Sequence, residues 1–211
     1  MTVLVIVESP GKVDKIKSYL GDNYRVVASY GHIRDLPPSD LGINPDTLMP
    51  SYVLTKSGGS VISRIKGYVS SSSQVLLATD PDREGEAIAW HLSKSLGLKN
   101  AQRVTFKAIT KDKVLEAVGS PRTINIKWVQ AQEARRVLDR IVGWRVSPAL
   151  GNRLSAGRVQ SPALRLVVDR ERERTTLQAV KHFGVTLVFI NQDGREWTAK
   201  YDASLPRGEK R

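Results

Sequence analysis

The 211-residue chain contains no cysteine, which excludes disulfide bonds, thiol chemistry and a cysteine-ligated zinc site. It also has no run of about 18 apolar residues, so no segment is predicted to cross a membrane. The start, MTVLVIVESPGK, lacks the positive charge that opens a signal peptide and is expected to form a buried strand. Acidic residues are scarce, with 21 Asp and Glu against 33 Lys and Arg, a formal net charge of +12. This balance predicts a polyanionic partner, most simply nucleic acid.

The positive charge is concentrated in about a quarter of the chain. Residues 121–175 hold 12 Lys and Arg against 5 Asp and Glu, and 11 of those 12 are arginine. Arginine makes bidentate contacts with phosphate and stacks on flat rings. The segment is therefore predicted to bind nucleic acid, although a solvated basic face would have the same composition.

Hydrophobic patterns predict alternating strands and helices up to about residue 119. The expected strands are 3–8, 24–30, 74–80 and 101–109. The expected helices are about 10–20 (capped by Ser9), 60–69, 84–97 and 110–118, and 31–57 is expected to be a long surface loop. Such alternation indicates an α/β fold with a largely parallel sheet. Arg-rich helices should follow over 126–150 and 159–177, and NQDG within 183–202 signals a β-hairpin.

Carboxylates gather in ATDPDREGEA, residues 78–87. Asp80, Asp82 and Glu84 are each two residues apart, on one side of an extended segment after a predicted strand. Glu8 ends another predicted strand, and ligands of α/β sheets bind beyond the carboxyl ends of strands, so these four are expected to converge. They would suit Mg²⁺, which prefers oxygen ligands. The alternative is an acidic helix start that the helix dipole favours. Three basic residues are candidates to offset their repulsion: Lys12, Arg34 and Arg83.

Five blocks of the chain resemble, in order, the N-terminal part of type IA DNA topoisomerases, specifically the bacterial topoisomerase I group. They are VIVESPGK, YGHIRDLP, LATDPDREGEAIAWHL, AQEARRVLDRIVGW and LSAGRVQSPALRLVVDRERE. The resemblance implies a Toprim α/β domain over 1–118, which is a domain shared with primases and some nucleases. It further implies an Arg-rich helical single-stranded-DNA-binding domain over 119–175 and a truncated β segment of the arch domain over 176–211.

The resemblance also implies roles for individual residues. Glu8 would act in acid/base chemistry at the scissile phosphodiester, and Lys12 would assist electrostatically. The implied Mg²⁺ ligands are Glu8, Asp80, Asp82 and Glu84. The candidates for DNA contacts are Arg34, Arg135, Arg136, Asp139, Trp144, Arg158, Gln160 and Ser161. An ordinary helix salt bridge is the alternative for Arg135 and Asp139. Trp144 stands where bacterial enzymes often have tyrosine, which retains base stacking and loses any hydroxyl hydrogen bond.

The implied activity is Mg²⁺-dependent relaxation of negatively supercoiled DNA by single-strand cleavage, strand passage and religation, in a cytoplasmic, nucleoid-associated enzyme. The family's nucleophile is a tyrosine in a Y-x-R-[ST] context, and none of the six tyrosines here has that context. The chain alone is therefore expected to be inactive and to need the remainder of the topoisomerase chain as a partner. One alternative is a non-enzymatic module that binds Mg²⁺ and single-stranded DNA. A Toprim nuclease or primase is disfavoured, because the later blocks match topoisomerases.

Overall fold

The computed structural model describes residues 2–151, 154–177 and 184–200. The chain separates into two compact units, residues 1–161 and 162–211. No helix within the described residues combines the length and the apolar character that crossing a membrane requires. The domain boundaries expected at 118 and 175 stay predictions.

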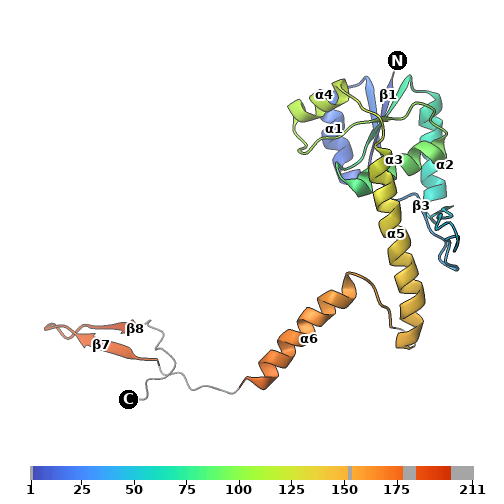
Figure 1. Ribbon diagram of the computed structural model, residues 1–211. Coiled ribbons are helices and arrows are strands. Elements are labelled where there is room, and N and C mark those ends of the chain that lie inside the picture. Colours follow the sequence, from blue (N-terminus) through green and yellow to red (C-terminus); the bar gives the residue numbers. More distant parts are fainter. Residues whose placement is uncertain (1, 152–153, 178–183, 201–211) are drawn as a thin grey trace. The chain divides into compact units, whose positions relative to one another are not determined.

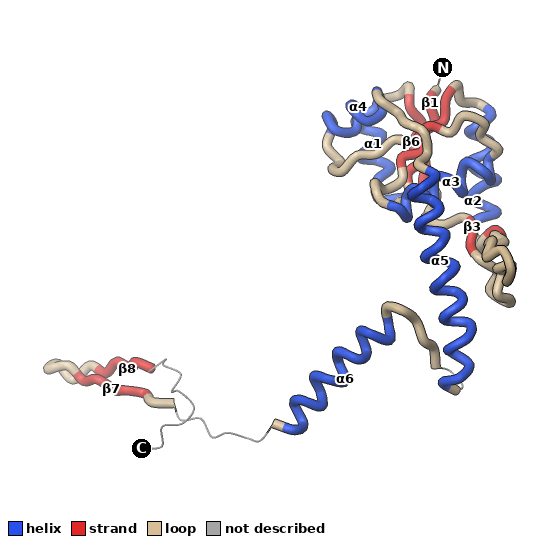
Figure 2. Tube along the Cα trace, viewed as in Figure 1, coloured by secondary structure: helices blue, strands red, loops and turns tan. Residues whose placement is uncertain are grey.

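The first unit is built on a four-stranded parallel sheet, which confirms the predicted α/β class (Figures 1 and 2). The strand order is β2-β1-β5-β6, with β1 Val3–Val7, β2 Tyr24–Ala28, β5 Gln74–Ala78 and β6 Gln102–Arg103. Val7 pairs with Ala28 on one side and with Ala78 on the other, so three strands end at the same edge. The predicted strand 101–109 is much shorter than expected, because only Gln102 and Arg103 pair with β5.

Helices cover both faces of this sheet. They are η1 Pro10–Lys12 (a 3₁₀ turn), α1 Val13–Leu20, α2 Gly58–Ser70, α3 Arg83–Leu96 and α4 Lys111–Gly119. Leu4 of β1 packs with Ile65 of α2 and with α3, whereas its neighbour Val5 packs with Val114 of α4 and with α1. A strand buried on both faces needs a continuous apolar run, which is why β1 reads VLVIV.

The start of the first helix differs from the prediction. The side chain of Ser9 makes no capping hydrogen bond, so its predicted capping role is wrong. Its backbone carbonyl instead accepts from Lys12 N at 3.2 Å, which closes the tight 3₁₀ turn before α1.

The segment predicted as a long loop contains two short strands that sequence patterns missed. They are β3 Arg34–Asp35 and β4 Val53–Leu54, paired antiparallel. Within this segment Leu36 and Ile43 are buried against Val137 of α5, Ile126–Val146. The segment is therefore attached to the long helix and is not free in solvent.

Helix α5 extends out of the α/β layer (Figure 1) and ends in a 3₁₀ turn, η2 Ser147–Leu150. Asn125 caps its start, since the Asn125 side chain accepts from Trp128 N at 3.3 Å. Its first half packs on α3 and its inner face buries Val129 and Gln132. The helix predicted over 126–150 is thus present, with a tighter last turn.

The remaining elements are α6 Gln160–Thr176 and an antiparallel hairpin, β7 Thr186–Ile190 and β8 Glu196–Lys200. No residue of α6 is buried. The turn follows from NQDG as predicted, because Asn191 Oδ1 accepts from the backbone N–H groups of Asp193 and Arg195 at 3.0 and 2.8 Å. Phe189 stacks on Trp197 across the two strands with ring centroids 4.2 Å apart.

Residues 79–85, which we call the acidic turn, run from the end of β5 into the first turn of α3 and are closely packed. Asp82 caps α3, accepting from Gly85 N at 2.7 Å, and Thr79 donates to the carbonyl of Gly85. A β-carbon at position 85 would lie 2.1 Å from the carbonyl oxygen of Asp80. Only glycine therefore fits this position without displacing the acidic turn.

We predict that Gly85→Ala destabilises the fold by about 1–3 kcal/mol through overpacking. Gly67→Ala is the matched control, because Gly67 is exposed in α2 with nothing within 4 Å of an added β-carbon. The control should gain up to about 1 kcal/mol from helix propensity. Urea unfolding of both variants measures the difference, and equal stabilities would contradict the packing argument.

The buried His91 of α3 should make stability depend on pH. It is 2% exposed, and burial followed by the positive charge of Arg34 lowers its pKa from 6.5 to about 4. The unfolded chain therefore binds a proton at higher pH than the folded chain, so acid favours unfolding. We expect the free energy of unfolding to fall by roughly 2 kcal/mol between pH 6.5 and pH 5 through this histidine alone.

Chemical unfolding at several pH values measures this loss, and His91→Phe should flatten the dependence in that window. The ring titration of His91 by NMR is a direct second measurement. A ring pKa near 6.5 would contradict the prediction.

Candidate metal and nucleic-acid site

The carboxyl ends of β1 and β5 bring Glu8 and Asp80 to one edge of the sheet. Glu8 directly follows Val7, whose partner Ala78 lies two residues before Asp80. Burial of the Glu8 carboxyl, together with the negative charge of Asp80, raises the Glu8 pKa above its usual value. Asp82 acts in the same direction. The negative charges of Asp80 and Asp82 therefore both act on the Glu8 carboxyl.

Lys12 supplies positive charge to this group. Its ammonium forms an ion pair with Asp80 and is itself only partly exposed. The 3₁₀ turn after β1 carries Lys12 to the edge of the sheet. The structure thus brings together Glu8, Lys12, Asp80 and Asp82. Arg83, another candidate to offset the negative charge, is exposed at the start of α3.

Glu84 faces a different neighbourhood. Its carboxylate pairs with His32 and lies 3.4 Å from Gln132 Nε2 of α5. Burial opposes ionisation of Glu84, but the hydrogen bond and charge of His32 outweigh it and the pKa is lowered. Of the predicted metal ligands, Glu84 is thus bound to His32 and Gln132 in this conformation and not grouped with Glu8, Asp80 and Asp82. Within the described residues, no group of three or more His, Asp and Glu side chains is close enough to hold a metal ion together.

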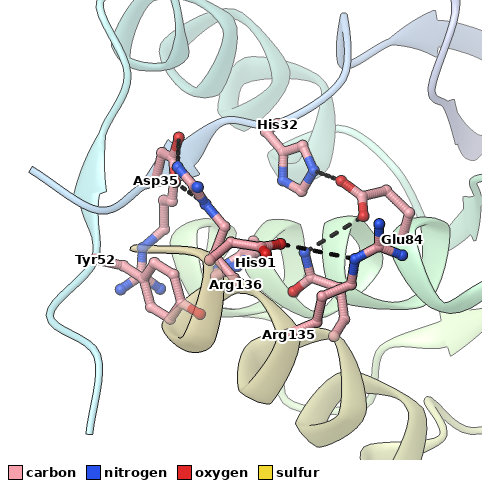
Figure 3. Close-up of a pocket in the computed structure, with 10 residues that line it drawn as sticks. His32, Asp35, Tyr52, Glu84, His91, Arg135 and Arg136 are labelled. Atoms are coloured by element: carbon pink, nitrogen blue, oxygen red, sulfur yellow. Dashed lines mark hydrogen bonds and ion pairs between the residues drawn. The ribbon is translucent and has the colours of Figure 1, made fainter. Parts of the chain in front are cut away.

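A cavity of about 390 Å³ opens beside Glu84, between the segment after β2, α3 and α5 (Figure 3). Its walls are polar and charged: His32, Arg34, Asp35, Tyr52, Glu84, His91, Gln132, Arg135, Arg136 and Asp139. Arg136 is held by Asp35 in a bidentate ion pair, in which Nε donates to Oδ1 at 2.9 Å and Nη2 donates to Oδ2 at 2.8 Å. The Arg34 guanidinium lies 5.5 Å from the centre of the Tyr52 ring. Four of the predicted DNA-contact residues, Arg34, Arg135, Arg136 and Asp139, therefore line one cavity.

Arg135 is the most exposed of these groups, with 69% of its side chain accessible. Its nearest partner, Asp139, is 3.8 Å away and is bound more closely by Arg158 at 2.7 Å. The helix salt bridge considered for Arg135 is therefore present but loose. An exposed, weakly paired guanidinium beside the cavity is available to an external anion.

The remaining predicted contact residues lie outside the cavity. Trp144 is 43% exposed, two turns beyond Arg136 on α5. Gln160 donates to Ser155 Oγ at 3.2 Å, and Ser161 Oγ accepts from Gly157 N at 3.3 Å. Both are exposed.

Sequence reasoning did not single out three residues of the cavity: Asp35, Tyr52 and Gln132. A signal existed for Gln132, because it lies three and four residues before Arg135 and Arg136 and so shares their helix face. His32 and Asp35 flank Arg34 in the block YGHIRDLP. No local pattern pointed to Tyr52, which reaches the cavity from the far end of the segment.

Comparisons with known proteins agree with this arrangement. Two family models match the chain, one described as a Toprim domain over residues 3–109 and one described as DNA topoisomerase over residues 123–208. A plasmid DNA topoisomerase I of Xylella fastidiosa (strain 9a5c) is 51% identical over 203 residues, which cover 94% of this chain and 31% of that protein.

A solved structure of full-length topoisomerase I from Thermotoga maritima is 41% identical, with a TM-score of 0.76. The match covers 96% of this chain and 35% of that one, so the chain spans about a third of the length of these relatives. Because both family models and both relatives agree, the chain belongs to the type IA DNA topoisomerase family, of which it corresponds to the N-terminal Toprim portion and the adjoining helical segment.

Proposed function

We propose that this chain supplies the metal-holding and strand-binding part of an enzyme that relaxes negatively supercoiled DNA by single-strand cleavage, strand passage and religation. The observation that carries the proposal is the placement of Glu8, Lys12 and Asp80 at one sheet edge. The same compact unit contains the arginine-lined cavity. Cytoplasmic location and association with the nucleoid belong to this proposal, since its substrate is chromosomal or plasmid DNA.

Glu8 is proposed as the general acid/base. A carboxyl whose pKa is raised by burial and by Asp80 keeps its proton closer to neutral pH than an exposed glutamate does. Such a group is suited to donate a proton to the 3′ oxygen that leaves when the phosphodiester is cleaved, and to take it back on religation. Lys12 lies beside it and would stabilise negative charge on the phosphate.

The carboxylates at this edge are the kind of donor that binds magnesium, although no three of them within the described residues are close enough in this conformation to hold the ion together. Mg²⁺ prefers oxygen ligands and is usually held by one or two carboxylates, with waters and substrate phosphate completing its shell. Asp80 and Asp82 both disfavour the charged form of Glu8, and Lys12 pairs with only one of the three, Asp80. We propose that Asp80, Asp82 and Glu84, with Glu8 beside them, hold the ion, which would supply positive charge for religation.

The cavity on α5 is proposed to bind single-stranded DNA. Arg135 and Arg34 would bind the phosphate backbone of the DNA strand, while Arg136 and Asp139 form part of the cavity wall. Arg158, Gln160 and Ser161 would contact the strand from the segment that follows η2. Trp144 further along α5 is exposed and would stack on a base.

We expect Arg135→Ala to weaken single-stranded DNA binding and to reduce the salt dependence of binding by about one phosphate contact. The control is Arg25→Ala, which removes the same charge from an exposed position near the start of β2, at the opposite end of that strand from the candidate site. Fluorescence anisotropy with a labelled oligonucleotide at several salt concentrations measures both quantities. If both variants lose the same DNA affinity, binding depends on net charge and not on the cavity, which would contradict the proposal.

The decisive experiment is relaxation of a supercoiled plasmid with Mg²⁺. Because no tyrosine here has the nucleophile's sequence context, we expect no relaxation by this chain alone. Adding a fragment that carries the tyrosine domain should restore relaxation. Relaxation by the chain alone would overturn the assignment of the nucleophile, and DNA binding without complementation would favour a non-enzymatic binding module.

A further inference from the structure

Glu86 is a fully buried carboxylate that the proposed chemistry does not use. Its side chain is 0% exposed, as is that of its partner Arg103. Arg103 Nε donates to one oxygen at 3.2 Å, and Arg122 donates to both oxygens at 2.8 and 2.7 Å. The backbone N–H of Asn125 donates to Oε1 at 2.6 Å. We call these four residues the Glu86 cluster.

On one side, the Glu86 cluster holds the backbone that carries the acidic turn. Arg103 Nη1 donates to the carbonyl of Leu77 at 3.1 Å and to that of Thr79 at 2.7 Å. Arg103 Nη2 donates to the carbonyl of Asp80 at 2.5 Å. One guanidinium thus fixes the end of β5 and the first residue of the turn.

On the other side, the Glu86 cluster holds the start of α5. The backbones of Arg103 and Arg122 pair with each other at 2.7 and 2.9 Å. Asn125 caps α5 with its side chain while its own N–H is bound by Glu86. Two turns later the same helix presents Gln132 and Arg135 to the cavity. Glu86 therefore joins both walls of the candidate site.

Stability alone is a poor explanation for such a cluster. Replacing a buried ion pair by apolar side chains is often neutral or stabilising, because removing charges from water is costly. What a carboxylate with four directed hydrogen bonds provides is a single relative position of the segments that donate them. Here Glu86 follows the acidic turn on α3, and its donors lie on β6 and just before α5, the helix that carries the cavity arginines.

We infer that Glu86 is a positioning residue that locks the acidic turn to the start of α5. Metal-holding and strand-binding groups then keep one relative position. This inference rests on the proposed function, because it concerns the same carboxylates and the same helix. Within the cluster, Arg122 lies just before α5 and binds Glu86, and it makes no hydrogen bond to the acidic turn.

The test uses Arg122→Gln, since Arg122 is 40% exposed and its loss leaves Glu86 paired with Arg103. Removing a positive charge should by itself strengthen Mg²⁺ binding. A released acidic turn should weaken it, by about threefold or more, as loss of supporting contacts around a metal site usually does. The two effects have opposite signs, so calorimetric titration with Mg²⁺ separates them.

Hydrogen exchange gives a second readout that does not depend on metal. In Arg122→Gln we expect faster exchange of the backbone amides in residues 79–85. Lys127→Gln is the matched control, because it removes one exposed charge from the first turn of α5 outside the cluster. It should not weaken Mg²⁺ binding, and it should leave the exchange of the turn unchanged.

A second variant, Glu86→Gln, keeps the shape and removes the charge, and should lower the Mg²⁺ affinity about tenfold. Val114→Ala on α4 controls for general destabilisation, as Val114 is fully buried away from the site. If both cluster variants bind Mg²⁺ and exchange like their controls, the inference is wrong while the proposed function stands. If the wild-type chain binds no Mg²⁺, the proposed metal site itself fails.

Discussion

β1 and β5 lie side by side in parallel, with Val7 opposite Ala78. This pairing fixes the positions of the residues that follow each strand. Residues that leave two parallel strands at matched positions must emerge at the same edge. Glu8 and Asp80, 72 positions apart in the chain, therefore become neighbours. Shifting this pairing by one residue would turn alternate side chains to the wrong face and separate the two carboxylates.

The concentration of acid here is possible because three of the carboxylates, Asp80, Glu84 and Glu86, have partners from other elements. Lys12 comes from the turn after β1, His32 from the segment after β2, and Arg103 from β6. Asp82 is satisfied locally by the first turn of α3. The acidic turn is thus held by contacts from several parts of the chain, and its negative charge is distributed over distinct neighbourhoods.

Ion pairs between elements also decide which charged side chains of the cavity are already bound within the protein and which remain accessible. Asp35 holds Arg136 in a bidentate pair, and Arg158 holds Asp139, so these groups shape the wall. Arg135 is left exposed with a loose partner. The arginines of α5 therefore differ in how accessible they are to an external anion, a distinction that composition alone does not make.

Much of the fold could be predicted, because periodic burial leaves a direct trace in the sequence. VLVIV and QVLLA read as strands buried on both faces, and the helix predicted over 84–97 is present as α3. The secondary-structure prediction was wrong at one helix start and in the segment expected to be a loop. Ser9 does not cap with its side chain, and β3 and β4 are two-residue strands too short to leave a pattern.

For the candidate site, the sequence by itself determined the candidate residues. They are the three acids of the D-x-D-x-E spacing, Glu8 at a strand end and the arginines on one face of α5. Those features are local, so they follow from periods of two and 3.6 residues. Only the tertiary structure decided the partners. Glu84 with His32, Arg136 with Asp35, and Glu86 with Arg122 are 52, 101 and 36 positions apart. Such pairings depend on how the sheet, the segment after β2 and α5 pack, and no local pattern encodes that packing.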